Sequence, residues 1–424
     1  MAARGTSVFL LGLIACLCPI AAAGASSAEV RAGVGRETFA LPAKVPLAGY
    51  SRRKGRPSTG VHDPVGARAL VLRDAQTTAV LVSCDLLIVD ERLFDAVRRR
   101  LVSRGIPPEA VLVVAGTHTH SGPGAYGARF FEKLSMGHAD PAVFEELVRA
   151  ITEAVVRAHD TLEPVRMAFR AAPTEGLVYN RVEAEGPVDA ELVVIGLFRD
   201  STHEPLAIIV NFAAHPTTLG AWNRQVSADY PGVIMRELEA RFPTATCLFF
   251  AGAAADQGPV KTGEGFERAE RIGLPLARQA AALLEAARVE PAETVTARQR
   301  AVELPPAEVR LGRWAVPRWL GARFVDDDAT LSVVLLGRTA VFGVPCDLAA
   351  SLGADLKAAA RAHHLQPVIA GFANDYVGYC VPEALYRAKQ YESSMAFNGP
   401  KAGELLVDHL QDMLDQIVTH DRSE

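Results

Sequence analysis

In the stretch Val111-Leu-Val-Val-Ala-Gly-Thr-His118-Thr-His120-Ser-Gly-Pro-Gly124, a short apolar run leads into two histidines and a turn rich in glycine and proline. The apolar run predicts a strand that ends just before the histidines. Residues two apart in an extended chain point to the same side, so both imidazoles can face one site. Imidazole is a common metal ligand and the usual acid–base group near neutral pH. The alternative is a polar turn in which the histidines only hydrogen-bond to their neighbours.

The rest of the chain predicts strands that alternate with helices. Strands are expected at 67–72, 79–83, 191–198, 206–212, 247–251, 331–344 and 367–370. Helices are expected at 91–103, from Asp140-Pro141 onward, and at 231–242, 267–288, 349–363 and 402–418. This alternation favours an α/β layered fold with a mixed β-sheet flanked by helices. Residues 290–328 are rich in proline and are predicted to be a linker or an insertion.

The composition is that of an ordinary globular protein. The 424 residues are 49% hydrophobic and 22% charged, which is sufficient for a large core. The formal net charge of -5 gives no overall attraction for nucleic acid or for an anionic membrane. Neither is therefore expected as a partner, and the oligomeric state stays open.

The N-terminus has the pattern of an export signal. Arg4 precedes the apolar run 8–20 and a small-residue stretch, which predicts a signal peptide at 1–25 and a periplasmic or secreted protein. The run is short for a membrane span. Leu13-Ile-Ala-Cys16 has the shape of a bacterial lipobox, so a lipid anchor at Cys16 is an alternative to soluble export. Four cysteines would remain, as buried thiols or with one disulfide: Cys84, Cys247, Cys346 and Cys380.

Further polar clusters lie at predicted strand ends and in loops. His215 ends one strand, and Asp347 follows another. Taken singly, these residues would more often be a capped strand end and a helix N-cap. Tyr379 belongs to a tyrosine-rich segment that could be core or lid, and Arg181 lies in a polar loop where it could be a solvated charge.

Together, these clusters resemble the catalytic domain of the neutral, non-lysosomal ceramidase family. The matching stretches, in chain order, are Leu47-Ala-Gly-Tyr50-Ser, Gly60-Val-His-Asp-Pro, Gly116-Thr-His-Thr-His-Ser-Gly-Pro123, Asn180-Arg181, Asn211 to His215, Val344-Pro-Cys-Asp347 and Tyr376 to Glu392. The resemblance implies a neutral-ceramidase-like catalytic domain over 29–424. It also implies a zinc-dependent hydrolase that cleaves the amide bond of an N-acylated, ceramide-like lipid or a related N-acyl amide.

The resemblance also implies roles for individual residues. Zinc would be held by four residues: His118, His215, Asp347 and Tyr379. His120 would lie near the scissile bond, and Arg181 and Tyr391 would hydrogen-bond the substrate carbonyl or its tetrahedral oxyanion. Asp256 belongs to a further motif of the family's site and is also taken as catalytic.

The chemistry of these side chains is consistent with that assignment. Two imidazoles, a carboxylate and an oxygen ligand suit zinc and leave a position open for water. Zinc lowers the pKa of a bound water toward neutrality, which would supply the nucleophile. His120 could then protonate the departing amine as a general acid.

Several departures from the family pattern leave alternatives open. Gly258 stands where the family has a serine, and Asp347 replaces a glutamate. Only 33 residues follow Tyr391, so the family's C-terminal immunoglobulin-like domain is expected to be absent. Without a basic amphipathic helix, little advantage is expected for ceramide in a membrane over small N-acyl amides. A non-catalytic exported binding protein and a zinc esterase are the competing functions.

Overall fold

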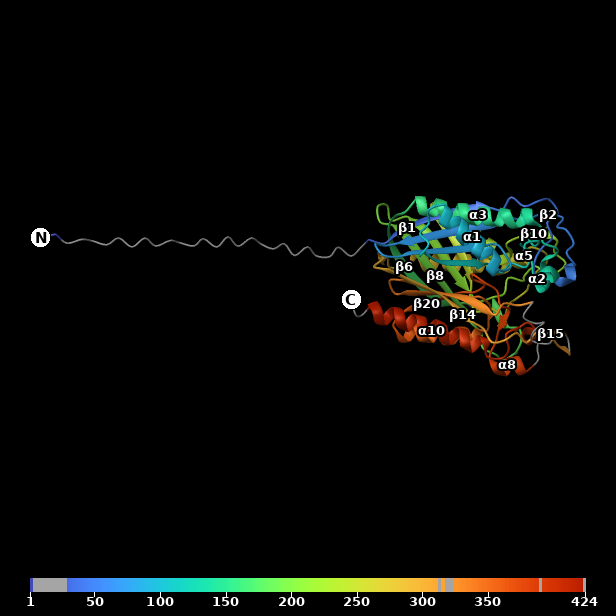
Figure 1. Cartoon of the computed structure of the whole chain (residues 1–424). Helices are drawn as coiled ribbons and strands as arrows, with labels where there is room; N and C mark the ends of the chain where they lie inside the picture. The colour runs from blue at the N-terminus through green and yellow to red at the C-terminus, as the bar shows by residue number, and fades with distance from the viewer. Residues whose placement is uncertain (3–28, 312–313, 317–323, 389–390, 422–424) are drawn as a thin grey trace.

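The computed structural model describes residues 1–2, 29–311, 314–316, 324–388 and 391–421 (Figure 1). The predicted signal peptide lies outside these ranges from residue 3 onward, and so does Cys16. Among the described helices, none combines the length and the apolar character needed to cross a bilayer.

A nine-stranded mixed sheet forms the centre of the described part of the chain. Its main order is β11-β9-β8-β6-β1-β3-β4-β5, and β13 pairs with β6. The β4–β5 and β9–β11 pairs are parallel, while the other neighbours are antiparallel. The strands are β1 (Arg31–Thr38), β3 (Gly66–Arg73), β4 (Thr78–Cys84), β5 (Val111–Gly116), β6 (Glu163–Pro173), β8 (Glu191–Arg199), β9 (Pro205–Phe212), β11 (Thr246–Ala251) and β13 (Glu290–Pro291). The mixed sheet expected from the sequence is confirmed.

A second, four-stranded sheet corrects two expectations. Its order is β14 (Val295–Glu303), β17 (Asp328–Leu336), β18 (Thr339–Gly343) and β20 (Gln366–Ala370). The region predicted as a linker or an insertion therefore contains β14. This strand was missed because polar residues such as Arg298 and Arg300 interrupt the apolar run that predicts a strand. The single strand predicted at 331–344 is a hairpin, because Gly337 adopts a left-handed φ of 52° and turns the chain.

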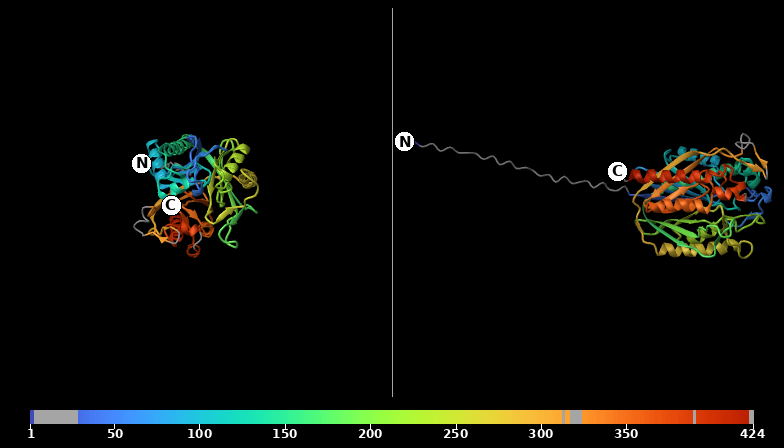
Figure 2. Two further views of the ribbon diagram at one scale, coloured as in Figure 1. Left: turned by 90° about the vertical axis from the view of Figure 1, so that its right-hand side faces the viewer. Right: turned by 90° about the horizontal axis from the view of Figure 1, so that it is seen from below.

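Helices cover both outer faces, so the layers run helix, sheet, sheet, helix (Figures 1 and 2). α1 (Glu91–Ser103) and α3 (Pro141–Asp160) lie over one half of the large sheet, and α4 (Asp229–Arg241) and α5 (Glu267–Glu285) over the other. α7 (Ala350–Ala362) and α10 (Ala402–Asp421) cover the second sheet. The core between the sheets includes Leu70, Leu81, Val113, Ile195 and Phe250 from one side and Val334, Val341 and Val368 from the other.

Two of these helices begin where the sequence predicts, because an aspartate caps each. The Asp90 carboxylate accepts a hydrogen bond from the backbone N–H of Leu93 at 2.8 Å, at the start of α1. Asp140 caps α3 in the same way, and Pro141 occupies its first turn. Capping side chains satisfy backbone N–H groups that have no partner inside the helix.

The large sheet is bent so that its two halves meet. β11 at one edge packs against β3, β4 and β5 of the other half, and the Ser83 hydroxyl donates to the carbonyl of Phe249 at 2.7 Å. The Asn211 amide donates to the carbonyls of Phe250 and Ile369, which joins β9 to β11 and to the second sheet. This bend brings the carboxyl ends of β5 and β9 close to the end of β18.

Short elements gather around those strand ends, at the right-hand end of the molecule in Figure 1. They are η1 (Ser51–Arg53), β2 (Gly60–Val61), α2 (Phe130–Met136), β7 (Val178–Asn180), β10 (Gln225–Val226), β12 (Gln257–Pro259), β15 (Arg310–Leu311), β16 (Trp314–Ala315), β19 (Asp347–Leu348), β21 (Tyr379–Cys380), α8 (Glu383–Arg387) and α9 (Tyr391–Ser394). All four cysteines are buried and free in this structure: Cys84, Cys247, Cys346 and Cys380.

Candidate metal centre

Three imidazoles converge at the end of the large sheet. The Nε2 atoms of His118 and His215 lie 3.0 Å apart, and the Nε2 of His120 lies 3.3 Å and 3.1 Å from them. His118 and His215 are buried, and His120 is partly exposed. Nitrogens separated by about 3 Å can all bond to one ion at zinc–nitrogen distances of about 2 Å. The side chains therefore form a cluster with the dimensions of a metal site.

The backbone at the end of β5 fixes the first of these rings. His118 adopts a left-handed φ of 64°, which turns the chain out of the strand. Its Nδ1 lies 2.7 Å from the carbonyl of Leu87, and its ring stacks on Phe372 with centroids 3.7 Å apart. A carbonyl can only accept, so Nδ1 carries the proton and the lone pair is at Nε2. This tautomer presents a ligand atom to the cluster.

Residues of the Leu47-Ala-Gly-Tyr50 motif hold the second ring. A Cβ on Gly49, whose φ is 99°, would lie 2.5 Å from the His120 ring, so glycine makes room for the imidazole. The Tyr50 ring packs against His120 with centroids 4.8 Å apart. Arg53 donates to the carbonyl of His120 and to that of Ala48. This motif of the sequence therefore positions His120.

His215 follows β9, where its backbone N–H donates to the carbonyl of Gln257 at 3.1 Å. Its Nδ1 lies 3.3 Å from the carbonyl of Ala254, which again leaves the lone pair at Nε2. The predicted pairing of His118 with His215 is thus present in the geometry.

Asp347 supplies a carboxylate beside the imidazoles. Its Oδ1 lies 3.8 Å from His118 Nε2 and 3.7 Å from His215 Nδ1. This oxygen is buried and has no hydrogen-bond partner among the described residues, whereas Oδ2 accepts from the Tyr376 hydroxyl at 2.8 Å. A buried carboxylate oxygen without a partner is costly unless a cation lies nearby. The donor set therefore fits a bound metal ion.

Burial dominates the electrostatics of these groups. It lowers the pKa of His118 to about 3 and that of His120 and His215 well below the usual range. It raises the pKa of Asp347 to about 7, against the opposing effects of Tyr376 and Arg181. Neutral imidazoles are the form that binds metals. A cation in the cluster would in turn favour the ionised carboxylate of Asp347.

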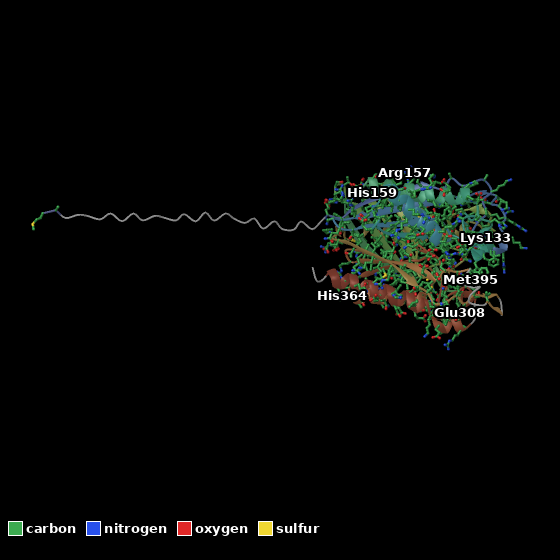
Figure 3. The ribbon with its side chains drawn as sticks, viewed as in Figure 1. Lys133, Arg157, His159, Glu308, His364 and Met395 are labelled. Carbon is green, nitrogen blue, oxygen red and sulfur yellow. The ribbon has the colours of Figure 1, made fainter. Side chains whose placement is uncertain are left out.

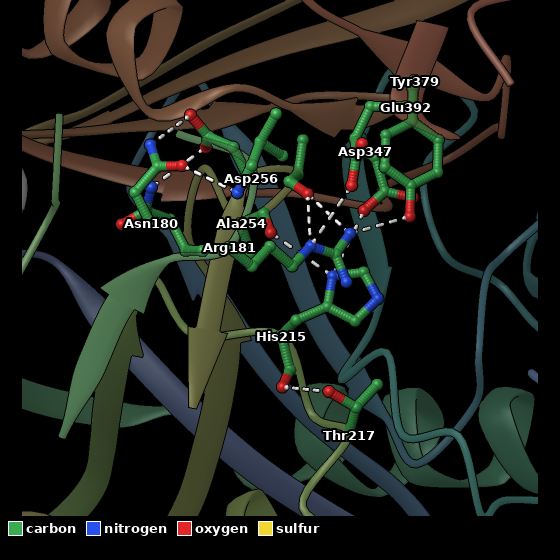
Figure 4. Close-up of polar contacts among 12 residues, drawn as sticks. Asn180, Arg181, His215, Thr217, Ala254, Asp256, Asp347, Tyr379 and Glu392 are labelled. Atoms are coloured by element: carbon green, nitrogen blue, oxygen red, sulfur yellow. Dashed lines mark hydrogen bonds and ion pairs between the residues drawn. The ribbon is translucent and has the colours of Figure 1, made fainter. Parts of the chain in front are cut away.

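Arg181 reaches this centre from the loop after β7 (Figure 4). Its guanidinium donates to the carbonyl of Ala255 at 2.6 Å and to the Tyr379 hydroxyl at 3.1 Å, and it lies 3.5 Å from Glu392. Burial lowers the pKa of Arg181, but Tyr379, Asp347 and Glu392 outweigh that effect and raise it. A fixed positive charge therefore lies beside the histidines.

Tyr379 and Asp347 come from paired strands. They are partners in the parallel β19–β21 ladder, and both line the same cavity. No role was expected for Glu392 and Tyr376 from the sequence, although both lie within the family-like stretch 376–392. The sequence does not show which residues they contact in the folded chain. The α9 helix begins at Tyr391, whose side chain is outside the described part of the structure.

Asp256 makes the contacts of a positioning residue. Its carboxylate accepts from the Asn180 amide at 3.1 Å, the Gln257 amide at 3.0 Å and the backbone N–H of Ala350 at 2.9 Å. Its own carbonyl accepts from the backbone N–H of Arg181 at 2.7 Å. These bonds hold the Arg181 loop and the start of α7, and the catalytic role expected of Asp256 from the sequence stays a prediction.

Gly258 lies in β12, opposite Tyr179 of β7. A Cβ at Gly258 would lie 3.0 Å from the Tyr179 ring and 3.2 Å from its hydroxyl. The tyrosine thus occupies much of the space that a serine side chain would need at this position.

A cavity of about 310 Å³ opens from the centre. Its polar lining includes His118, His120, Asp347 and Tyr379 from the centre, together with Arg129 and Glu132. Most of the other lining side chains are apolar: Leu87, Ile88, Phe131, Leu134, Met136, Phe324, Val325, Met395 and Phe397. The cavity therefore combines the polar groups of the centre with a large apolar surface.

Residues 31–245 match the family described as neutral/alkaline non-lysosomal ceramidase, N-terminal. The chain belongs to this family. The neutral ceramidase of Pseudomonas aeruginosa is 26% identical over 279 residues, which cover 59% of this chain and 41% of that protein. Neutral ceramidase B of Dictyostelium discoideum is 27% identical over 50% of this chain and 32% of that protein. This chain thus matches less than half the length of these ceramidases.

The fold agrees with the family assignment. A crystal structure of the Pseudomonas aeruginosa neutral ceramidase superimposes with a TM-score of 0.83 and 21% identity, covering 93% of this chain and 75% of the other. The family match ends at residue 245, so it includes His118, His120, Arg181 and His215. Asp347 and Tyr379 join the site through the fold instead.

Proposed function

We propose that this chain is a zinc-dependent hydrolase of the amide bond in an N-acylated, ceramide-like lipid. The observation that carries the proposal is the convergence of three imidazole Nε2 atoms within 3.3 Å beside the unpartnered Oδ1 of Asp347. Membership of the ceramidase family supports amide hydrolysis as the reaction, and the names of the relatives support ceramide as the substrate class.

His118, His215 and Asp347 would hold the zinc, with Tyr379 beside them on the neighbouring strand. Bound zinc supplies a Lewis acid for the substrate carbonyl and lowers the pKa of water. The protein's contribution is to hold the proton on Nδ1 of His118 and His215, through the carbonyls of Leu87 and Ala254, so that Nε2 keeps its lone pair. Tyr376 orients the Asp347 carboxylate in the same way.

His120 is proposed as the group that protonates the leaving amine. It is the most exposed of the three imidazoles and lines the cavity where substrate would enter. Its Nε2 is also close enough to the other two to be a third metal ligand. The variant His120→Ala separates these roles, because loss of a proton donor leaves the zinc bound whereas loss of a ligand releases it.

Arg181 is proposed to stabilise the negative charge that develops on the carbonyl oxygen. Its guanidinium is held by the carbonyl of Ala255 and the Tyr379 hydroxyl, so it needs little reorganisation when charge appears. The family resemblance implies the same role for Tyr391. The apolar part of the cavity lining suits the acyl chain, because burial of each methylene contributes about 0.8 kcal/mol.

The test combines metal content with a substrate panel. Purified protein is expected to carry one zinc per chain, and His118→Ala is expected to lose both the zinc and hydrolysis of N-acyl amides. His138→Ala, which removes an exposed histidine outside the cluster, is the matched control. Chelators should abolish activity, and serine-directed phosphonates should not, because Gly258 offers no hydroxyl.

The competing functions predict different results in the same panel. Zinc-loaded protein that cleaves esters but leaves the matching amides intact would be a zinc esterase. Zinc-loaded protein that binds N-acyl lipids and cleaves neither would be a binding protein. Covalent labelling of a serine near the site by a phosphonate would contradict the proposed metal-dependent reaction.

A further inference from the structure

Positive charge is concentrated in one short stretch of a chain whose net charge is -5. Residues 44–56 contain five lysines and arginines, and the whole span 38–62 contains no aspartate or glutamate. Arg53 is buried and serves the His120 loop, whereas Arg52, Lys54 and Arg56 are exposed. Lys133 on α2 is exposed as well. We call these four exposed cations the basic lip: Arg52, Lys54, Arg56 and Lys133.

The basic lip is not neutralised by the protein. Within the described residues, none of its four side chains forms an ion pair or a side-chain hydrogen bond. Exposed arginines elsewhere commonly have a carboxylate partner, such as Arg241 with Glu285 at 2.6 Å and Arg271 with Glu267 at 2.6 Å. The four charges of the lip are therefore available to an external anion.

The basic lip borders the mouth of the cavity. Ser51, next to Arg52, lines the cavity, and η1 packs against α2. A Cβ on Gly55 would lie 3.2 Å from the Cα of Gly137, just after α2. Figure 3 shows Lys133 at the same end of the molecule as Met395, a cavity residue, and this end faces the viewer on the left of Figure 2.

Two exposed apolar side chains accompany these cations. Phe130 and Leu134 are 47% and 49% exposed and lie four residues apart on α2, hence on one face of the helix. Leu134 also lines the cavity. Of the nearby carboxylates, Glu91 and Asp326 bind Arg129, and that of Glu132 accepts from the backbone N–H of Arg129 at 2.7 Å. The mouth thus presents free cations and apolar groups together.

We propose that this surface docks on a lipid bilayer with anionic head groups, so that the cavity opens against the membrane. The basic lip would attract the head groups, and Phe130 would insert beside them. The inference deepens the proposed function, on which it rests for its lipid substrate, since an acyl chain could then pass from bilayer to cavity without crossing water. A nucleic acid would meet the cations but would leave the apolar pair and the apolar cavity wall unexplained.

Vesicle binding tests the proposal directly. The full chain is mixed with phosphatidylcholine vesicles, with and without phosphatidylserine, and the bound fraction is measured by sedimentation. Binding is expected with phosphatidylserine and should weaken as salt is raised. Each cation near an anionic surface contributes about fivefold to binding. The triple variant Arg52→Gln, Lys54→Gln, Arg56→Gln should therefore bind about a hundredfold more weakly.

A matched triple variant removes the same charge from other parts of the surface. Arg73, Arg98 and Arg278 are exposed and unpaired among the described residues, and Arg73→Gln, Arg98→Gln, Arg278→Gln should bind like the unmodified chain. Phe130→Gln should weaken the binding that persists at high salt. Equal loss in both triple variants, or no binding to any vesicle, would overturn the proposal. Equal competition by heparin and by phosphatidylserine vesicles, with no effect of Phe130→Gln, would indicate a general polyanion site and would also overturn it.

The outcome can be separated from failure of the proposed chemistry. Vesicle binding is measured a second time with His118→Ala, which is expected to bind vesicles although it lacks activity. Turnover of a short, soluble N-acyl amide is expected to be unchanged in the Arg52, Lys54 and Arg56 variant, because these side chains do not line the cavity. If the unmodified chain binds the vesicles but does not hydrolyse the soluble amide, that result would count against the proposed enzyme function and not against membrane docking.

Discussion

Backbone carbonyls and one tyrosine determine the chemistry of the metal centre at the scale of single residues. The carbonyls of Leu87 and Ala254 fix the tautomers of His118 and His215, and the Tyr376 hydroxyl holds Asp347. The sequence identified the ligand-type residues through their motifs. It could not identify Tyr376 as the partner of Asp347, because the contact joins residues 29 positions apart that meet only in the folded chain.

Removing the Tyr376 hydroxyl should weaken metal binding without creating a cavity in the core. In Tyr376→Phe, Asp347 loses its orienting hydrogen bond, and such a loss typically costs 10- to 100-fold in metal affinity, so zinc affinity should fall by about that factor. Competition with a chromophoric chelator measures the affinity. Tyr386→Phe, which removes a hydroxyl bonded to Glu308, is the control. Equal zinc affinities in the two variants would contradict this role.

Gly49 should be required for the position of His120. In Gly49→Ala the new Cβ would lie 2.5 Å from the imidazole, so we expect a loss of about 2–4 kcal/mol in the free energy of unfolding, together with loss of activity. Gly105→Ala is matched, because Gly105 also has a φ near 90° but has no atom within 4 Å of where the added methyl group would lie. That control should cost only about 1–2 kcal/mol and keep activity. If both variants lost similar free energy of unfolding, the cost at Gly49 would come from backbone strain and not from a clash with His120.

At the scale of elements, the long apolar strands and the capped helices were predictable, while polar strands were not. The expected helix at 91–103 coincides with α1, because Asp90 caps an amphipathic segment. β1 and β6 were missed although they lie in the middle of the large sheet, since β1 reads Arg-Ala-Gly-Val-Gly-Arg-Glu-Thr. Two glycines in β1 allow α3 to approach closely, and a Cβ on Gly33 would lie 2.0 Å from the carbonyl oxygen of Ala158. Tertiary contact, rather than local propensity, thus specifies that strand.

The end of β4 should confer a pH dependence on stability. Burial raises the pKa of Asp85, next to β4, to about 6, although Arg68 and the backbone N–H of Gly66 oppose the rise. Because the pKa of this carboxyl is higher in the folded chain than in the unfolded chain, the folded chain holds the proton more tightly. The free energy of unfolding should therefore fall as the pH rises from about 4, near the unfolded pKa, through about 6, the folded pKa. Relative to the unmodified chain, Asp85→Asn should gain up to about 3 kcal/mol above pH 7 and little at pH 4.

Urea unfolding at a series of pH values measures this difference. Asp95→Asn, which removes a half-exposed carboxylate on α1, controls for the change in net charge. A difference between Asp85→Asn and the unmodified chain that stays constant from pH 4 to pH 8 would contradict the assignment.

For the molecule as a whole, the two sheets share a core and the site forms at their common end. The sequence predicted the layered class through alternation, but the second sheet was obscured where β14 was expected to be a linker. The net charge of -5 also gave no indication of the basic lip, because it sums over the whole chain. That surface combines segments about 80 residues apart, and only the fold brings them together. The proposed membrane docking is the opposite of the expectation from the sequence, which was little advantage for membrane-bound substrate, and the vesicle experiment decides between them.

The shared core should make the two sheets unfold together. Phe250 is fully buried between them, and Phe250→Ala should lower the free energy of unfolding by about 3–5 kcal/mol. Val102→Ala, at a 43% exposed position on α1, should change it little. Tryptophan fluorescence and far-ultraviolet circular dichroism are expected to give coincident unfolding curves. Two separate transitions would show that the sheets are independent units.

The proposed ligands come from both sheets, His118 and His215 from the large one and Asp347 from the chain that follows β18 of the second. Neither half of the chain carries the full set. Zinc bound there would link the two sheets. The fraction of molecules that bind zinc would therefore equal the fraction in which the two sheets are packed correctly. A proteolysed or partly misfolded preparation would therefore contain less than one zinc per chain, which can be measured before any substrate is added. Zinc supplied during refolding would favour the correctly packed form by mass action.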